Sequence, residues 1–73
     1  MACISPDGSP TETGTWMLRA LSSGLGYPEE IAQDTGIPLF RVRSGLRELN
    51  KAGLASQNND RHEITEKGAK LIE

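Results

Sequence analysis

The sequence has few of the residues on which disulfide-linked, zinc-binding or membrane-spanning folds depend. Its 73 residues include a single cysteine, Cys3, and one each of Trp, Tyr and Phe. One cysteine excludes an intrachain disulfide and a zinc site made of several thiolates, so we interpret Cys3 as incidental. The sequence has no run of about 18 apolar residues, and its start lacks a basic region followed by an apolar one. We therefore expect a cytoplasmic protein without a membrane segment.

Signatures of catalysis and metal binding are also missing. The sequence has no glycine-rich phosphate loop, no paired histidines, and no serine or cysteine nucleophile beside a plausible base. Its one histidine, His62, has no second histidine with which to share a metal ion. So short a chain also leaves little volume for a ligand pocket of roughly 300 Å³ or more. We expect neither an enzyme nor a bound metal or cofactor.

The charge is small in total and uneven along the chain. The formal net charge is −2. Residues 1–37 carry five acidic side chains and one basic, whereas residues 38–73 carry seven basic and five acidic. Phosphate contacts supply most of the non-specific affinity of proteins for nucleic acid. The overall acidity therefore argues against a nucleic-acid partner, but the C-terminal half has the positive charge that such a partner needs.

The N-terminal part predicts a tail and one short helix. Residues 1–13 combine two prolines and a glycine with several Ser and Thr and show no apolar period, so we expect a disordered tail. The folded domain is placed at residues 14–73. A helix is predicted over residues 15–23, where apolar side chains recur four residues apart. We expect Trp16 in the core and Tyr27 at the edge of the core.

Two further helices follow. Pro28 suits the first turn of a helix that runs to about Thr35, and Gly36 can adopt the left-handed conformation that closes it. Pro38 opens the third helix and Gly53 ends it. Apolar residues of this helix recur at spacings of four and three, and its other faces are largely cationic. The buried seam is expected to consist of Val42, Leu46 and Leu49.

The C-terminal part predicts a hairpin and a last helix. Residues 54–64 are expected to form two short strands, because Asn58-Asn59-Asp60 tolerates the dihedral angles of a turn. Thr65 can cap a helix that runs through Ile72. The expected fold class is therefore α+β, mainly α with a small β-hairpin.

Three phrases of the sequence resemble those of winged helix-turn-helix domains. They are PEEIAQDTGIP, VRSGLRELNKAGL and RHEITEKGAKLIE, and the resemblance covers residues 15–73. In bacterial and archaeal regulators of the MarR and ArsR kinds, a Gly-aliphatic turn separates two helices, an LxxLxxxGL phrase ends the recognition helix, and an lTekG phrase follows the wing. The corresponding segments here are Gly36-Ile37, Leu46 to Leu54, and Ile64 to Gly68. The resemblance implies a three-helix core with a wing and a C-terminal helix.

The resemblance also implies that the chain binds double-stranded DNA and regulates transcription. The helix near Leu39 to Ala52 would enter the major groove, and the wing would contact the backbone. Arg41 and Arg43 are expected at base edges, and Arg47 and Arg61 at phosphates. A module this small needs a homodimer or a protein partner for useful specificity, with the first and last helices as candidate surfaces. The matching positions are Leu39, Phe40, Arg41, Arg43, Ser44 and Arg47 in the helix and Asn58, Asn59, Arg61 and His62 in the wing.

Two residues depart from the family's pattern. Where DNA-binding relatives place small polar residues at the start of the recognition helix, this sequence has Leu39 and Phe40. These side chains could contact thymine methyl groups or cover the edge of the core, or they could form a patch that binds a protein. The alternative is therefore a winged-helix protein–protein interaction module that does not bind nucleic acid.

Overall fold

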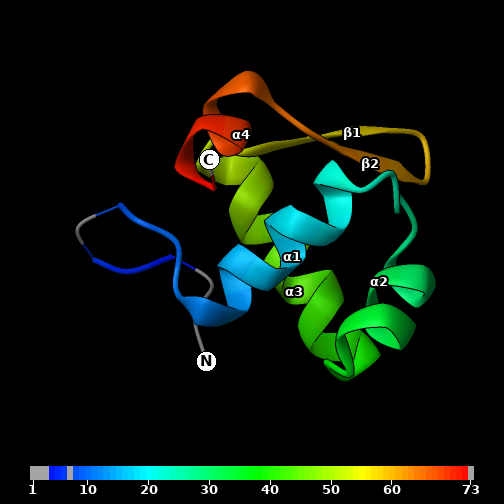
Figure 1. Cartoon of the computed structure of the whole chain (residues 1–73). Coiled ribbons are helices and arrows are strands. Elements are labelled where there is room, and N and C mark those ends of the chain that lie inside the picture. Colours follow the sequence, from blue (N-terminus) through cyan, green and yellow to red (C-terminus); the bar gives the residue numbers. More distant parts are fainter. Residues whose placement is uncertain (1–3, 7, 73) are drawn as a thin grey trace.

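The computed structural model describes residues 4–6 and 8–72, which form an α+β fold. Within these ranges there are four helices and a two-stranded antiparallel hairpin, so the coarse fold class predicted from the sequence is confirmed. Figure 1 shows the hairpin lying across one end of the helical part. The elements in chain order are α1 (Glu12–Ser22), α2 (Pro28–Thr35), α3 (Leu39–Lys51), β1 (Ala55–Asn58), β2 (Arg61–Ile64) and α4 (Glu66–Leu71).

Helix α1 begins earlier than the sequence predicts. The Thr11 hydroxyl accepts a hydrogen bond of 3.3 Å from the N–H of Gly14, and the helix starts at Glu12 instead of Thr15. A threonine in this position satisfies a backbone donor that the first turn cannot pair by itself. The predicted start lies too far along the chain because the apolar period on which the prediction relied begins only at Trp16.

The other helices form where the sequence predicts them. Pro28 is the first residue of α2, and Gly36 closes the helix with a φ of 79°, in the left-handed region that favours glycine. α3 starts at Leu39 and ends just before the predicted glycine stop. At α4, the Thr65 hydroxyl accepts a hydrogen bond of 3.1 Å from the N–H of Gly68, as expected of a helix cap.

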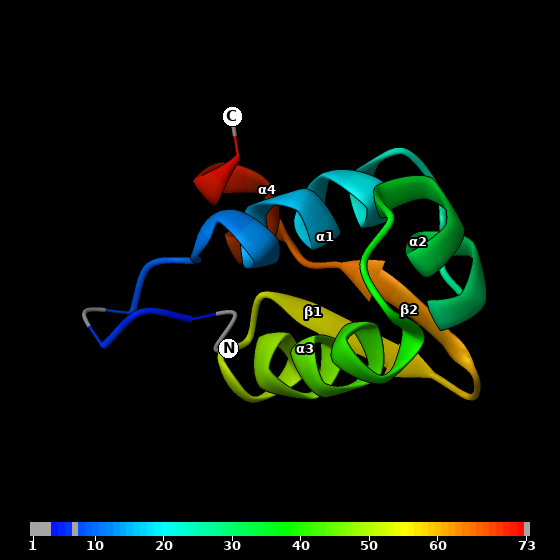
Figure 2. The ribbon, with the colours of Figure 1, turned by 90° about the horizontal axis from the view of Figure 1, so that it is seen from below.

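The hairpin has the predicted turn and lies between two helices. Ala55 pairs with Ile64 and Asn58 with Arg61. Asn59 reverses the chain with a φ of 59°, a conformation that asparagine tolerates better than most residues. Figure 2 shows β2 running beside α1 and β1 beside α3, and these pairs are in contact. The hairpin therefore closes the core on the side that the helices leave open.

The core is aliphatic and is built from α1, α2, α3 and the start of the hairpin, and Ile64 of β2 packs against it, partly buried. Its most deeply buried large side chains are Met17, Leu18, Ile31, Val42, Leu46, Leu49 and Leu54. Burial of the predicted α3 seam is thus confirmed. The prediction for Trp16 was wrong, because its side chain is 47% exposed. Successive residues of a helix point about 100° apart, and here Met17 occupies the inward position next to Trp16. Tyr27, expected at the edge of the core, is 44% exposed.

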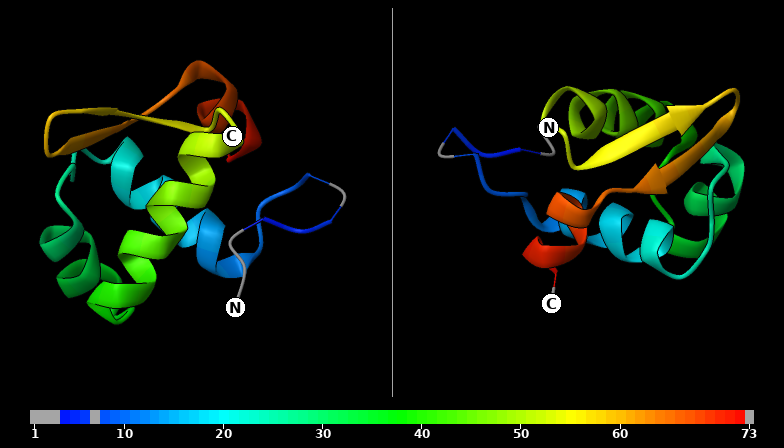
Figure 3. Two further views of the ribbon diagram at one scale, coloured as in Figure 1. Left: turned by 180° about the vertical axis from the view of Figure 1, so that it is seen from behind. Right: turned by 90° about the horizontal axis from the view of Figure 1, so that it is seen from above.

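The described part of the N-terminal segment folds back on itself. Ile4 forms an isolated antiparallel bridge with Pro10, and the N–H of Ser5 donates to the Ser9 carbonyl at 2.7 Å. Ile4 also packs, partly buried, against the core. Figure 3 shows this segment as a loop that extends from the start of α1. The sequence offered no apolar period to predict these contacts, and Cys3 lies outside the described residues.

Candidate functional site

The face of α3 that points away from the core carries a row of exposed side chains. Val42, Gly45, Leu46 and Leu49 are buried, and they define the inner side of the helix. A helix advances about 100° per residue, so the outermost row consists of positions separated by four, three and four residues. All four residues of this outer row are exposed. They are Phe40, Ser44, Arg47 and Lys51.

Two cations of the outer row have no ion-pair partner in the described part of the chain. Neither Arg47 nor Lys51 forms an ion pair with any residue in the described ranges. Lys51 was not among the residues predicted from the sequence. The signal was present, since Lys51 follows Arg47 by four residues and Ser44 by seven on the same face. Both cations are free to attract an anionic partner.

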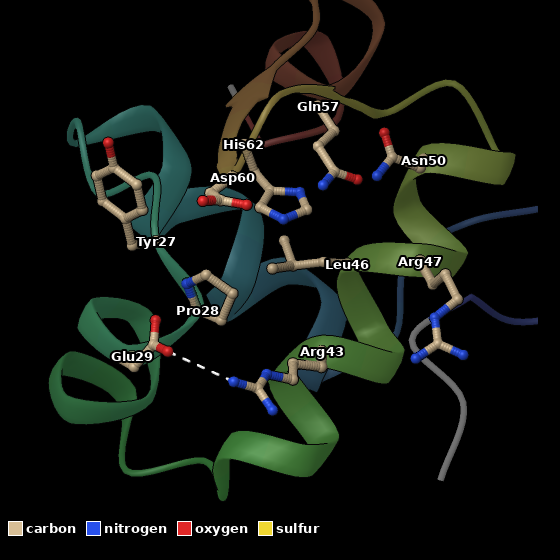
Figure 4. Close-up of a pocket in the computed structure, with 10 residues that line it drawn as sticks. All are labelled: Tyr27, Pro28, Glu29, Arg43, Leu46, Arg47, Asn50, Gln57, Asp60 and His62. Atoms are coloured by element: carbon tan, nitrogen blue, oxygen red, sulfur yellow. Dashed lines mark hydrogen bonds and ion pairs between the residues drawn. The ribbon is translucent and has the colours of Figure 1, made fainter.

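The two arginines expected at base edges lie on different flanks of α3. Residues two apart on a helix do not share a face. Arg43 lies toward α2, where its guanidinium forms an ion pair of 3.4 Å with the carboxylate of Glu29 (Figure 4). The guanidinium of Arg41 lies over the Phe40 ring, 5.9 Å from the ring centroid. The fold thus brings Arg43 and Arg47 together on the hairpin side and directs Arg41 elsewhere.

The two apolar residues at the start of α3 have different environments. Leu39 is half-buried, whereas Phe40 is 69% exposed and is the most exposed large apolar side chain in the described ranges. Phe40 therefore projects from the outer row with no core role.

The turn of the hairpin presents polar groups beside α3. Asn58, Asn59 and Asp60 are exposed, and the side chain of Gln57 donates to the Asn59 carbonyl at 2.8 Å. Arg61 is exposed as predicted, although its guanidinium lies 3.5 Å from the carboxylate of Glu63. A phosphate at this position would compete with that carboxylate.

His62 does not lie with the other predicted wing residues. Side chains alternate between the two faces of a strand, and in β2 this places Arg61 outside and His62 inside. The His62 side chain is only 8% exposed, so it is not presented to a partner beyond the hairpin. Its backbone N–H donates to the Gly26 carbonyl at 2.7 Å, which ties the hairpin to the segment before α2.

A groove lies between the start of α2, the hairpin side of α3 and the hairpin turn. Its volume is about 430 Å³, and Figure 4 shows Leu46 and Pro28 near its centre. The expectation that the chain lacks volume for a pocket of this size was wrong, because the space forms between surface elements instead of inside the core. The Nδ1 atom of His62 is buried beside the groove and has no hydrogen-bond partner among the described residues. Burial lowers the pKa of this imidazole.

The described ranges offer neither a metal centre nor a membrane-spanning helix. Their residues include no cluster of three or more His, Cys, Asp or Glu side chains that could hold a metal ion. No helix in the same ranges has both the length and the apolar character needed to cross a bilayer. The candidate site consists of the exposed face of α3, the hairpin turn and the groove between them.

Comparisons with models of protein families, with characterised proteins and with solved structures find no match to this chain. The site's clearest chemical features are Arg47 and Lys51, which have no ion-pair partner among the described residues, and the groove beside α3.

Proposed function

We propose that this chain is a winged-helix module that binds duplex DNA, with α3 in the major groove and the hairpin turn against the neighbouring backbone. The observation that carries the proposal is the outer row of α3, on which Arg47 and Lys51 stand exposed and unpaired within the described chain. The major groove is about 12 Å wide and accepts one α-helix. The hairpin lies beside this helix, where it could contact the flanking strand.

Each side chain of the outer face has a role consistent with its place. Arg47 and Lys51 suit phosphate contacts, because exposed cations without an ion-pair partner have little to lose on binding an anion. Arg43 can reach a guanine edge if that contact replaces its exposed pair with Glu29. Phe40 can pack on a thymine methyl group. On the flank, Arg41 is placed for an adjacent phosphate.

The test is a titration of fluorescently labelled mixed-sequence duplex between about 50 and 200 mM salt, followed by anisotropy. The affinity of the unmodified chain should fall steeply as salt rises. The double variant Arg47→Ala/Lys51→Ala should reduce the slope of log affinity against log salt by about 0.9 for each phosphate that the protein no longer neutralises. Arg19→Ala is the matched control, because Arg19 is an exposed cation on α1. The proposal fails if the double variant and the control give the same affinity and slope.

A dimer is part of this proposal. A single small module buries only about 600–1,000 Å² on DNA, which is little for specific recognition. α1 and α4 are in contact with each other, and they expose Trp16 and Leu71 by 47% and 46%. Sedimentation with and without DNA would show whether two copies bind one site.

A second candidate function, a protein-binding module, is favoured by one observation. Phe40 is 69% exposed on the outer row and is not part of the core. A partner held by an apolar contact would stay bound in high salt, whereas DNA would be released. If Phe40→Ala removes a salt-resistant protein partner and the Arg47→Ala/Lys51→Ala variant keeps it, this second function is supported over the first.

A further inference from the structure

The groove between α2, α3 and the hairpin has edges of opposite charge. Arg43 and Arg47 form a cationic edge on α3. Glu29 at the start of α2 lies at this same edge, where its carboxylate pairs with Arg43 at 3.4 Å, and Asp60 in the hairpin turn brings a second carboxylate to another side of the groove, as Figure 4 shows. Leu46 lies at its centre and gives it an apolar floor. This arrangement suits a molecule with an anionic group at one end and hydrogen-bond donors at the other.

One buried polar atom beside the groove lacks a hydrogen-bond partner among the described residues, and two amide side chains line the same wall. Buried polar atoms are nearly always hydrogen-bonded, yet Nδ1 of His62 is enclosed without a partner in the part of the chain that the structure describes. The Gln57 side chain donates a hydrogen bond to Asn59 through its nitrogen, so its oxygen remains able to accept one. Asn50 adds a second amide to the same wall. These groups are positioned to bind a ligand rich in donors and acceptors.

We propose that this groove is a binding site for a small purine nucleotide. Guanidinium groups are the side chains best suited to hold a phosphate. Arg47 supplies one directly, and Arg43 supplies a second when the phosphate replaces its exposed pair with Glu29. A carboxylate only accepts hydrogen bonds, so Asp60 calls for N–H donors such as those of a guanine base. Tyr27 lines the same space and presents a partly exposed ring on which a base can stack. A volume of about 430 Å³ lies within the usual range for small-molecule sites.

The same chemistry could come from a free nucleotide or from a nucleotide within a DNA strand. Asp60 argues for the free molecule, because its carboxylate would repel a further phosphate of a strand laid through the groove beyond Arg43 and Arg47. Arg43 and Arg47 also belong to the proposed DNA-binding face. The inference rests on the proposed function in this one respect: because both ligands would use these two arginines, the nucleotide and DNA should exclude one another.

The direct test is a titration of the isotope-labelled full chain with guanosine 5′-monophosphate, followed by backbone amide shifts and calorimetry. We expect saturable shifts confined to residues 27–29, 43–50 and 57–62. Guanosine without its phosphate should bind at least about tenfold more weakly, and Arg47→Ala should have a similar effect. Lys51→Ala, which removes a cation of the outer row outside the groove, should leave nucleotide affinity unchanged.

Asp60→Asn tests the base end of the site. It should weaken guanosine 5′-monophosphate by about tenfold, because a carboxylate acceptor becomes an amide that also donates. Asp34→Asn is the matched control, since Asp34 is an exposed carboxylate of α2 that does not line the groove. Both positions are exposed, so neither change should disturb the fold. Thermal unfolding of each variant checks this point.

The outcomes separate this inference from the proposed function. Saturable nucleotide binding that Asp60→Asn weakens supports the groove as a site, whether or not duplex DNA binds. Absence of shifts at millimolar nucleotide, or equal affinity in Asp60→Asn and Asp34→Asn, overturns the inference even if DNA binding holds. Salt-sensitive DNA binding that is lost in both Arg47→Ala and Lys51→Ala but unaffected by saturating nucleotide rejects the exclusion alone. Binding only to the strand, with none to the free nucleotide, also overturns the inference.

Discussion

At the scale of the residue, His62 directs its imidazole to the inner face of the hairpin. Protonation of the ring would add a buried positive charge there. Its Nδ1 is enclosed without a hydrogen-bond partner in the described chain, and the groove beside it holds both carboxylates and guanidinium groups. The burial that lowers the pKa of His62 makes the protonated ring less favourable in the folded state than in the unfolded chain. The stability of the fold therefore depends on pH through this side chain.

We expect the free energy of unfolding to decrease as the pH falls below about 6.5, the usual pKa of histidine in an unfolded chain. In this window the unfolded state binds more protons than the folded state, so acid favours unfolding until the pH drops below the lowered pKa of the folded protein. Urea unfolding at several pH values measures the effect. His62 is the only histidine, so His62→Gln should flatten the dependence in this window. An unchanged slope in the variant would contradict the assignment.

Gly68 is a second residue with a definite packing role. A Cβ atom at this position would collide with the backbone carbonyl oxygen of Leu54 and crowd the side chain of Ile64. Alanine is intrinsically better than glycine in a helix by about 1 kcal/mol, so propensity alone favours Gly68→Ala. Because backbone cannot move aside cheaply, we expect a net destabilisation of about 1–3 kcal/mol in urea unfolding. Lys70→Ala, on the exposed side of the same helix, should change stability by less than about 0.5 kcal/mol.

At the scale of the element, the ion pair between Glu29 and Arg43 links the start of α2 to the middle of α3. Both side chains are more than half exposed, so the pair contributes little to stability. Its consequence is for binding, since Arg43 must exchange this carboxylate for any anion that it contacts. The first turn of α2 therefore lowers the affinity of the α3 face for anions.

We predict that Glu29→Gln raises the affinity for duplex DNA by about two- to fivefold, in line with the modest strength of exposed ion pairs. Glu30→Gln is the matched control, because it removes the same charge from the same helix turn without releasing Arg43. Anisotropy titrations of the two variants at one salt concentration give the comparison. If both variants gain equally, the effect is one of net charge and the role of the ion pair is refuted.

The elements differ in how well the sequence predicts them, for physical reasons. α2 and the hairpin turn were predictable because their ends depend on local chemistry: proline in a first turn, glycine with positive φ, and asparagine in a turn. The start of α1 was missed because its Thr11 cap lies among residues that resemble a tail. Burial of His62 and exposure of Trp16 depend on which elements pack together, and a local sequence pattern does not predict this packing.

The candidate site was predictable in part for the same reason. The cationic face of α3 follows from helical periodicity, and the divergence of Arg41 and Arg43 could have been read from their spacing of two. The pair of Arg43 with Glu29 joins residues fourteen positions apart, and the groove combines three elements. Those features arise only from the tertiary arrangement.

At the scale of the whole molecule, a small aliphatic core supports the entire fold. Typical stabilities per residue imply a total of roughly 4–11 kcal/mol for a chain of this length. We predict that Leu49→Ala, at a fully buried position of α3, removes about 2–5 kcal/mol, a large part of that total. Phe40→Ala removes a larger side chain but an exposed one, so its effect should stay within about 0.5 kcal/mol. Thermal and urea unfolding of the two variants decide between these expectations.

The half-exposed position of Trp16 gives the molecule a built-in fluorophore. It is the only tryptophan, it lies on α1, and it does not line the groove beside α3. Its emission should therefore begin partly red-shifted, change further on unfolding, and respond little to a ligand in the groove. Tyr27, the only tyrosine, lines that groove. Long-wavelength excitation selects the tryptophan and the tyrosine signal follows by difference, so one unlabelled sample can separate events at the groove from loss of the fold.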